Sequence, residues 1–215
     1  WKSVAVCMNS TLAASFTDSA FDHFATETFA NLFIATMTKY EGRFTAPVAF
    51  PAEDVKEPLG KVLADTGKNQ LRIAETYKYA HVTYFFNGHV EAPFKNEYRV
   101  LIPSLKNVHP EEHPELMASA VTARIVEAMQ SRSFDFILVN YSNPDTIAHT
   151  GNFAASQEAV RVIDHEVARL VVSAKESDAA LIITSDHGNL EEVINPQTGR
   201  AETQHDINPV PVYII

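Results

Sequence analysis

The fold is indicated most clearly by residues 179–189, AALIITSDHGN. The apolar run at 179–184 predicts a strand that is buried on both faces, and ionisable residues follow it directly. Gly188 permits a sharp bend after the strand, so that Asp186 and His187 can both turn toward one site. In open α/β sheets, ligands bind at the carboxyl ends of strands. The stretch therefore predicts a sheet strand that ends at a functional site.

Strand-like and helix-like segments alternate along the rest of the chain. Strands are expected at Val4–Cys7, Leu32–Met37, Leu71–Ala74, Val82–Phe86, Phe134–Asn140, Ala179–Thr184 and Val210–Ile215. Helices are expected at Glu53–Thr66 with Gly67 as C-cap, at Pro114–Gln130 and at Phe153–Glu176, and the segment between the first two strands is a further candidate. This alternation predicts an α/β fold with a mostly parallel sheet flanked by helices. The turn-rich stretch 42–51 is the expected boundary between two domains, 1–48 and 49–215.

The composition excludes several classes of protein. With 46% hydrophobic and 20% charged residues, the 215-residue chain is typical of a globular protein and not of a disordered one. No apolar run approaches the about 20 residues of a membrane-spanning helix. A net charge of −10 disfavours nucleic acid as a partner. The single cysteine, Cys7, cannot form an internal disulfide, which indicates a reducing, cytoplasmic compartment.

A second candidate site follows the strand expected at 134–140. Residues 143–151, NPDTIAHTG, place Asp145 and His149 one helical turn apart on the same face. A carboxylate and an imidazole that converge in this way suit a divalent transition metal. The same spacing also fits an ordinary helix start with Asp145 as its cap, and spacing alone does not decide between the two.

The other histidines differ in how well they fit a site. His205 precedes the last expected strand, where a lone histidine is usually a surface residue, but the two motifs make it a third candidate ligand. The remaining six are expected to be structural or solvated: His23, His81, His89, His109, His113 and His165. The chain has no G-x-x-x-x-G-K-[ST] loop, no G-x-G-x-x-G fingerprint and no G-x-S-x-G elbow. A metal-centred site is therefore the strongest hypothesis from the residues themselves.

These motifs resemble the metal-binding core of the alkaline phosphatase superfamily. More closely, residues 31–215 are similar to the cofactor-independent phosphoglycerate mutase family. The similarity is carried by residues 71–88 (LRIAETYKYAHVTYFFNG), 99–104 (RVLIPS), 140–151, 185–191 and His205 with residues 208–211. In that family a phosphatase-like domain is split around an inserted phosphotransferase domain. The resemblance implies that residues 1–48 end the inserted α/β domain and that 49–215 form most of the second phosphatase segment.

The resemblance also implies a set of ligands. Asp145, His149 and His205 would hold one of two divalent metal ions, usually manganese, and Asp186 and His187 would contribute to the other. The family's serine nucleophile and one further metal aspartate would lie in a segment outside this chain. The chain by itself is therefore expected to be inactive.

Lys78 has two possible roles. By its position it reads as a solvated lysine whose stem covers an aromatic ring. The resemblance instead places it beside the transferred phosphoryl group, as a catalytic and substrate-binding residue. The implied reaction is the interconversion of 3-phosphoglycerate and 2-phosphoglycerate through a phosphoserine, in glycolysis and gluconeogenesis. The implied enzyme is a cytoplasmic monomer with a small-molecule substrate and no nucleic-acid or membrane partner.

The chain departs from the family at several positions. Thr11 and Ala14 stand where the family has substrate-binding arginines, and neither can clamp a carboxylate or a phosphate bidentately. Tyr77 replaces a common glutamate, and His89 and Asn96 replace glycines. The metal half of the site thus matches the family better than the substrate half. Two alternatives stay open: a metal-dependent phosphatase or phosphodiesterase of the same superfamily, and a non-catalytic homologue that binds a metal or a partner.

Overall fold

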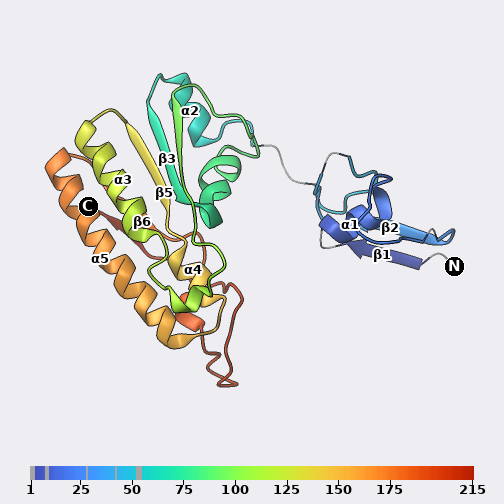
Figure 1. Ribbon diagram of the computed structural model, residues 1–215. Helices are drawn as coiled ribbons and strands as arrows, with labels where there is room; N and C mark the ends of the chain where they lie inside the picture. Colours follow the sequence, from blue (N-terminus) through green and yellow to red (C-terminus); the bar gives the residue numbers. More distant parts are fainter. Residues whose placement is uncertain (1–2, 8–9, 28, 42, 52–54) are drawn as a thin grey trace. The chain divides into compact units, whose positions relative to one another are not determined.

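The computed structural model describes residues 3–7, 10–27, 29–41, 43–51 and 55–215 (Figure 1). The chain forms two compact units, Trp1–Asp54 and Val55–Ile215. The sequence places the boundary after residue 48, and the assignment of residues 1–48 to an inserted domain stays a prediction.

The first unit is built on a pair of parallel strands. Strands β1 (Ser3–Cys7) and β2 (Leu32–Thr36) pair with Ser3 opposite Leu32. Helix α1 (Ser10–Thr17) lies between the two strands in the sequence and contacts β1. Ala13 of α1 is fully buried. The two expected strands and the candidate helix between them are thus present.

The second unit contains a three-stranded parallel sheet. Strand β3 (Gln70–Glu75) lies in the centre, between β4 (Glu97–Ile102) and β5 (Phe136–Asn140) (Figure 1). All six residues of β3 are buried, as expected of a central parallel strand. The predicted α/β fold with a mostly parallel sheet flanked by helices is confirmed.

Helices cover both faces of this sheet. On one face, Leu71 and Ile73 of β3 pack against α3 (Ala118–Ser131) and α5 (Phe153–Ser177) in the main apolar core. On the other face, the Gln70 side chain donates to the Gly60 carbonyl of α2 (Leu59–Asp65), 2.9 Å away. Successive side chains of a strand point to opposite faces, so one strand supplies both layers. Figure 1 shows α3 and α5 lying side by side.

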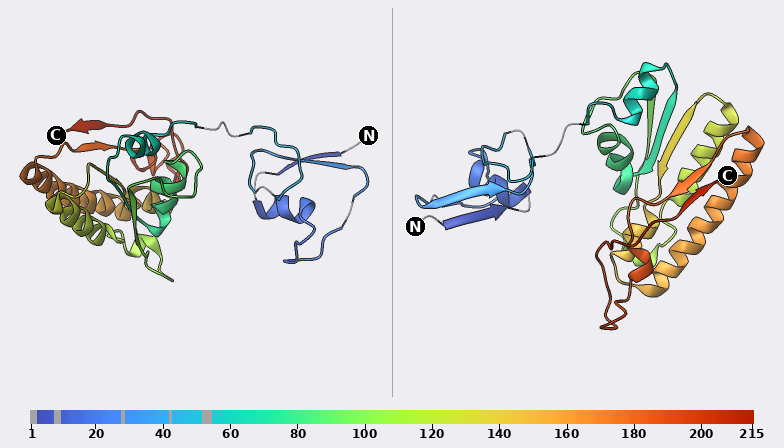
Figure 2. Two further views of the ribbon diagram at one scale, coloured as in Figure 1. Left: turned by 90° about the horizontal axis from the view of Figure 1, so that it is seen from above. Right: turned by 180° about the vertical axis from the view of Figure 1, so that it is seen from behind.

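The remaining elements are short. They are the 3₁₀ turns η1 (Thr76–Lys78), η3 (Pro110–Glu112) and η4 (Leu190–Glu192), the π-helical turn η2 (His81–Phe85), helix α4 (Asn143–Ala148), and strands β6 (Ile182–Thr184) and β7 (Val212–Ile214). β6 and β7 form a separate antiparallel pair, seen side by side in Figure 2. In the described ranges, no helix combines the length and the apolar character that crossing a lipid bilayer requires.

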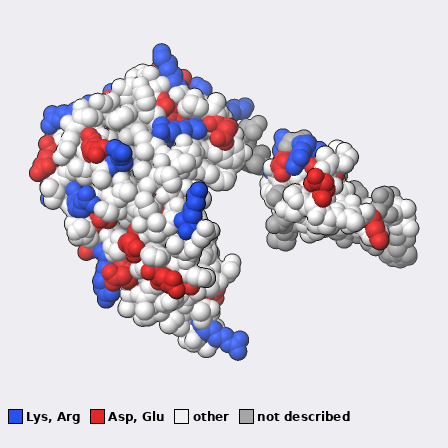
Figure 3. Space-filling model, viewed as in Figure 1, with Lys and Arg blue, Asp and Glu red and all other residues white. Residues whose placement is uncertain are grey.

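Charged side chains of both signs are interspersed over the face of the second unit that Figure 3 shows. At exposed positions of α3 and α5 they form pairs one turn apart, such as Arg124–Glu127 at 2.9 Å and Arg161–Glu158 at 3.0 Å. Such exposed pairs contribute only about 0.3–0.5 kcal/mol each. The stability of the two helices therefore rests mainly on their apolar faces.

The prediction of a strand at residues 82–86 is wrong. Residues 82–85 belong to η2, in which Val82 and Thr83 are buried and the Thr83 hydroxyl donates to the Tyr79 carbonyl at 2.8 Å. The Thr, Tyr and Phe content that favours a strand reflects packing on a surface more than an intrinsic backbone preference. Here the aromatic side chains pack against one another and against β5, where the Phe86 and Phe136 rings stack at 6.3 Å.

Three other expectations need correction. α2 begins at Leu59, directly after Pro58, and not at residue 53; residues 53 and 54 lie outside the described ranges. α3 begins at Ala118 and not at residue 114, because Leu116 has a left-handed φ of 38° that no helix accommodates. β6 is not buried on both faces: Ile182 is 64% exposed, since β6 pairs only with β7 among the described strands.

Replacing Gly88 with Ala is expected to destabilise the fold by about 2 kcal/mol. Gly88 has a φ of +66°, and an added Cβ would lie 3.0 Å from the Cβ and carbonyl oxygen of Val55. Gly199 has the same φ of +66° but open space around it, so Gly199→Ala is a control that carries only the backbone strain. Urea unfolding of both variants measures the difference, and equal losses would show that the contact with Val55 has no effect.

Candidate metal centre

The sequence-predicted site residues lie where two strands end. β5 leads into α4, whose first turn carries Asp145, and β6 leads directly to Asp186 and His187. Pro144, in the same turn, favours a helix start because its fixed φ suits the first helical positions. His205 arrives from the loop before β7. Elements distant in sequence therefore bring their polar side chains to one place.

Asp145, His149 and His205 converge on a common point. Asp145 Oδ1 lies 3.0 Å from His149 Nε2 and 3.0 Å from His205 Nε2. The two Nε2 atoms lie 3.2 Å apart. Ligands at right angles around an ion, each at about 2.1 Å, would be about 3 Å apart. The spacing of the three atoms is thus that of neighbouring ligands of one metal ion.

His187 joins this cluster, whereas Asp186 lies at its edge. The His187 ring stacks on His205 with centroids 3.6 Å apart, and its Nε2 lies 3.8 Å from Asp145 Oδ1. Potential ligand atoms of Asp145, His187 and His205 all lie within 4.8 Å of one another. The Asp186 side chain is 47% exposed, and its Oδ1 lies 3.6 Å from His187 Nε2.

The protonation of the cluster suits a bound cation. The short contact of 2.7 Å between His149 Nδ1 and the Thr203 carbonyl requires Nδ1 to donate. In the neutral imidazole, Nε2 of His149 then presents a lone pair to Asp145 and His205. A carboxylate oxygen and imidazole lone pairs that face one another repel unless a proton or a metal ion lies between them. The donor set therefore fits a divalent transition metal.

Lys78 is not a solvated residue. It is only 4% exposed, and its Nζ donates to Asp145 Oδ2 at 2.6 Å. This bond occupies one carboxylate oxygen and leaves Oδ1 for the histidines. Burial by itself would raise the pKa of Asp145, but the hydrogen bond and charge of Lys78 and the hydrogen bond from Asn189 lower that pKa to about 2.

The low pKa of Asp145 predicts a loss of stability in acid. Its folded-state pKa of about 2 lies below the unfolded value of about 3.9. The ionised group therefore stabilises the fold above about pH 4, by at most about 2–3 kcal/mol, and this contribution is lost as the pH falls toward 2. Carbon-13 NMR titration of the metal-free chain measures the pKa directly. Titration of Asp145 near pH 4, like that of an exposed aspartate, would contradict the prediction.

One buried residue of the site, Asn189, and one beside the start of α4, Glu75, were not expected from the sequence. Asn189 is 4% exposed and donates through Nδ2 to Asp145 Oδ1 at 3.1 Å, while its own Oδ1 has no hydrogen-bond partner among the described residues. Glu75, at the end of β3, is 1% exposed and accepts a 2.6 Å hydrogen bond from the Ser142 hydroxyl. Asn189 directly follows the D-H-G residues, which is a signal that could have identified it. Glu75 ends a strand, which could have identified it too.

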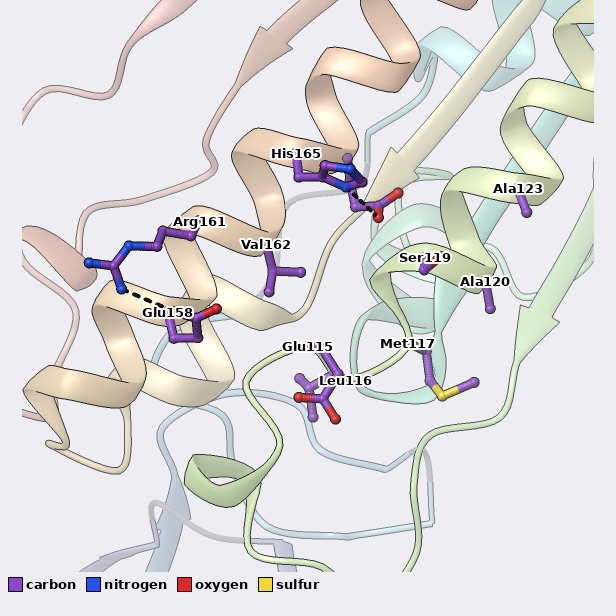
Figure 4. Close-up of a pocket in the computed structure, with 11 residues that line it drawn as sticks. Glu115, Leu116, Met117, Ser119, Ala120, Ala123, Glu158, Arg161, Val162 and His165 are labelled. Carbon is purple, nitrogen blue, oxygen red and sulfur yellow. Dashed lines mark hydrogen bonds and ion pairs between the residues drawn. The ribbon is translucent and has the colours of Figure 1, made fainter.

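A larger hollow, of about 720 Å³, lies between α3 and α5 and shares no lining residue with the metal cluster (Figure 4). Its apolar lining includes Leu116, Met117 and Val162. His165, expected to be structural or solvated, lies at its rim with a 74% exposed side chain and contacts Glu166 at 3.3 Å. The buried Glu166 also pairs with Arg169 at 2.5 Å, so this group is structural.

The positions of the replaced arginines lie in the first unit. Thr11 and Ala14 line a hollow of about 220 Å³ together with Asp18, Glu41 and Arg43. Arg43 is the one Lys or Arg among the described lining residues, and it pairs with Asp18 at 3.0 Å and Glu41 at 2.8 Å. This hollow therefore offers no uncompensated positive charge to an anion in the described part of the chain.

Comparison with known proteins supports the resemblance. A 2,3-bisphosphoglycerate-independent phosphoglycerate mutase of Francisella tularensis subsp. novicida (strain U112) is 43% identical over 204 residues, which cover 94% of this chain and 40% of that protein. One from Clostridium botulinum (strain Langeland / NCTC 10281 / Type F) is 44% identical over 201 residues, covering 93% and 39%. The chain thus spans about two fifths of the length of these curated relatives.

A solved structure agrees with the fold. A phosphoglycerate mutase of Leishmania mexicana, studied at low cobalt concentration, superposes with a TM-score of 0.77 at 26% identity, covering 94% of this chain and 40% of that one. The similarity to cofactor-independent phosphoglycerate mutases that the motifs indicate is thereby confirmed. The family model for the Metalloenzyme superfamily matches residues 11–215. The chain belongs to the Metalloenzyme superfamily.

Proposed function

We propose that Asp145, His149 and His205 hold one divalent metal ion and that Asp186 and His187 contribute to a second. The observation that carries the first part is the approach of one carboxylate oxygen and two imidazole nitrogens to within 3.2 Å of one another. The second part rests on the family resemblance and on the position of both residues at the end of β6. Manganese is the proposed ion, because the family resemblance implies it and carboxylate oxygens suit it.

We propose further that a polypeptide containing this chain interconverts 3-phosphoglycerate and 2-phosphoglycerate through a phosphoserine, as a step of glycolysis and gluconeogenesis. The names of the relatives and the architecture of the site support this activity. A bound metal ion would neutralise phosphoryl oxygens and lower the pKa of a nucleophilic hydroxyl. The serine itself is proposed to lie outside the present sequence.

The described residues have separate roles in this proposal. Lys78 fixes the orientation of the Asp145 carboxylate through Oδ2, and it is the proposed cation beside the transferred phosphoryl group. Asn189 holds Asp145 Oδ1 from the other side at 3.1 Å. The Thr203 carbonyl fixes the His149 tautomer, so that Nε2 faces the cluster. A cytoplasmic location and a monomeric state complete the proposal. The single cysteine agrees with the location, and the net charge of −10, which opposes self-association, agrees with the monomer.

A coupled assay tests the activity. A longer polypeptide, which contains this chain and the sequence that its relatives have outside the matched region, is loaded with manganese. The formation of 2-phosphoglycerate from 3-phosphoglycerate is then followed together with the release of inorganic phosphate. The proposal expects 2-phosphoglycerate without stoichiometric phosphate release, and no activity from the 215-residue chain alone. Absence of 2-phosphoglycerate formation by the metal-loaded polypeptide would refute it.

A metal-dependent phosphatase is the second candidate, and one specific observation favours it. The hollow that contains Thr11 and Ala14 is lined by Asp18 and Glu41, and its Arg43 is already paired with both carboxylates. Such a hollow holds a glycerate carboxylate poorly, so that water could accept the phosphoryl group instead. Phosphate release without 2-phosphoglycerate, in the same assay, would identify this activity.

A further inference from the structure

Glu75 is a buried carboxyl group that has only neutral hydrogen-bond donors around it. It is the last residue of β3 and is 1% exposed. Its Oε2 accepts hydrogen bonds from the Ser142 hydroxyl at 2.6 Å and from the Met117 amide at 3.4 Å, while its Oε1 has no partner among the described residues. A buried carboxyl group without a charged partner contributes little to stability or lowers it. Its place at the end of the central strand therefore points to a role beyond packing.

The segments that follow β3 and β5 are joined by two hydrogen bonds. β3 and β5 are parallel neighbours, and both lead toward α4 (Figure 1). The Ser142 hydroxyl donates to Glu75, and three residues further along each segment Lys78 donates to Asp145 Oδ2, also at 2.6 Å. The first bond holds the residue at which α4 starts, and the second holds the carboxylate that α4 carries. The position of Asp145 thus depends on both bonds.

Ser142 is the N-cap of α4, but its side chain does not cap the helix. An N-cap serine usually accepts a hydrogen bond from an amide of the first turn, whereas this hydroxyl donates to Glu75. The Ser142 carbonyl accepts from the Thr146 amide at 2.9 Å, so a shift of Ser142 would be passed on to the turn that contains Asp145. α4 has only six residues, and so short a helix depends on tertiary contacts for its stability. The contact with Glu75 is one of these.

We propose that Glu75 is a positioning residue of the metal site: through the Ser142 hydroxyl it fixes the start of α4 and so places the Asp145 carboxylate between Lys78 and the histidines. This inference rests on the proposed metal site and adds to it a residue that is not itself a ligand. Because Glu75 acts through Ser142, the loss of either partner should misplace Asp145 to the same extent. Loss of a group that orients a metal ligand typically costs about 10–100-fold in metal affinity.

Two substitutions of Glu75 that remove the same charge provide the test. Glu75→Met removes both acceptor oxygens, whereas Glu75→Gln keeps an amide oxygen that accepts from the Ser142 hydroxyl. Isothermal titration calorimetry of the folded chains is expected to show that Glu75→Met binds Mn²⁺ about tenfold or more weakly than Glu75→Gln. Ser142→Ala should weaken binding as Glu75→Met does. The double variant should bind no more weakly than either single variant, because both changes break one hydrogen bond.

A stability cycle in the metal-free chain separates this inference from the proposed metal site. Lys78→Met is introduced into the Glu75→Met and the Glu75→Gln chains, and urea unfolding is measured for each pair. If Glu75 places Asp145, then Lys78 has already lost its partner in the Glu75→Met chain. The stability lost through Lys78→Met should there be about half or less of the loss in the Glu75→Gln chain. If the unmodified chain binds no Mn²⁺, the proposed metal site fails, and this cycle still decides the role of Glu75.

Two results would overturn the proposal. One is equal affinity of the Glu75→Met and Glu75→Gln chains for Mn²⁺, and the other is an equal loss of stability through Lys78→Met in both. Glu75 would then have a structural role only, and the start of α4 would be held by other contacts, such as that of Asn143 Nδ2 with the Pro114 carbonyl at 2.7 Å. If the Glu75→Met chain does not fold, Ser142→Ala and Ser142→Thr give the same comparison, because threonine keeps the hydroxyl.

Discussion

The Asp145→Asn variant is expected to bind Mn²⁺ at least about a hundredfold more weakly than the unmodified chain, a loss of about 2.7 kcal/mol. Among the described residues, Asp145 is the one carboxylate within 3.0 Å of both His149 and His205, so it supplies the negative charge of the first proposed ion site. Removal of residues that merely orient ligands typically costs 10–100-fold in metal affinity, and removal of a ligand should cost at least as much. Asn preserves the shape and an oxygen, so the comparison isolates the charge. Isothermal titration calorimetry at neutral pH measures the change.

Asp65→Asn is the matched control. Asp65 is 62% exposed in its side chain and pairs with Lys61 one turn earlier in α2, away from the cluster. This variant removes one negative charge of the same kind, so any general effect of net charge on cation binding appears in it as well. Equal Mn²⁺ affinities for the two variants would show that Asp145 is not a ligand.

The Lys78→Met variant is expected to destabilise the metal-free chain by about 3 kcal/mol. Lys78 and Asp145 form an ion pair with side-chain exposures of only 6% and 18%, and the variant leaves the carboxylate without its charge partner. A bound divalent ion would replace that partner, so the loss should shrink in saturating Mn²⁺. In a polypeptide with mutase activity, loss of a cation beside the phosphoryl group should also reduce kcat/KM by about a hundredfold.

Lys68→Met gives the comparison for a solvated pair. Lys68 contacts Asp135 at 3.0 Å with exposures of 52% and 42%, and such pairs contribute at most about 1 kcal/mol. Urea unfolding of both variants, with and without Mn²⁺, separates the two environments. If Lys78→Met were as mild as Lys68→Met, the ion pair with Asp145 would have no structural role.

The periodic patterns of apolar residues in the sequence predicted the fold well. The apolar stripe of α5 and the apolar run of β5 gave both elements nearly their observed bounds, because the period of each pattern is set by backbone geometry. The expected strand at 82–86 failed because β propensity depends on context, and the neighbouring sheet and aromatic rings favour the π-helical turn η2. β4 was not expected, since its sequence EYRVLI includes the charged Glu97 and Arg99 and does not alternate strictly between apolar and polar residues.

The candidate site was predictable in its residue types but not in its internal contacts. The spacing of Asp145 and His149 and the D-H-G residues after a strand identify the ends of β5 and β6 as the place of chemistry. No local pattern shows that Lys78 is buried, because its partner Asp145 is distant in sequence and only the packing of η1 against the sheet brings them together. The grouping of His187 with His205 depends likewise on the course of a loop.

The shared metal site can be tested with an anomalous-difference map of crystals of this chain soaked in Mn²⁺. A manganese peak is expected within about 2.0–2.3 Å of Asp145 Oδ1, His149 Nε2 and His205 Nε2. The Asp145→Asn crystals, soaked in the same way, should lack this peak or show it much weakened. A map without density between these three atoms, or with manganese only at other carboxylates, would show that the three residues do not hold a common metal ion.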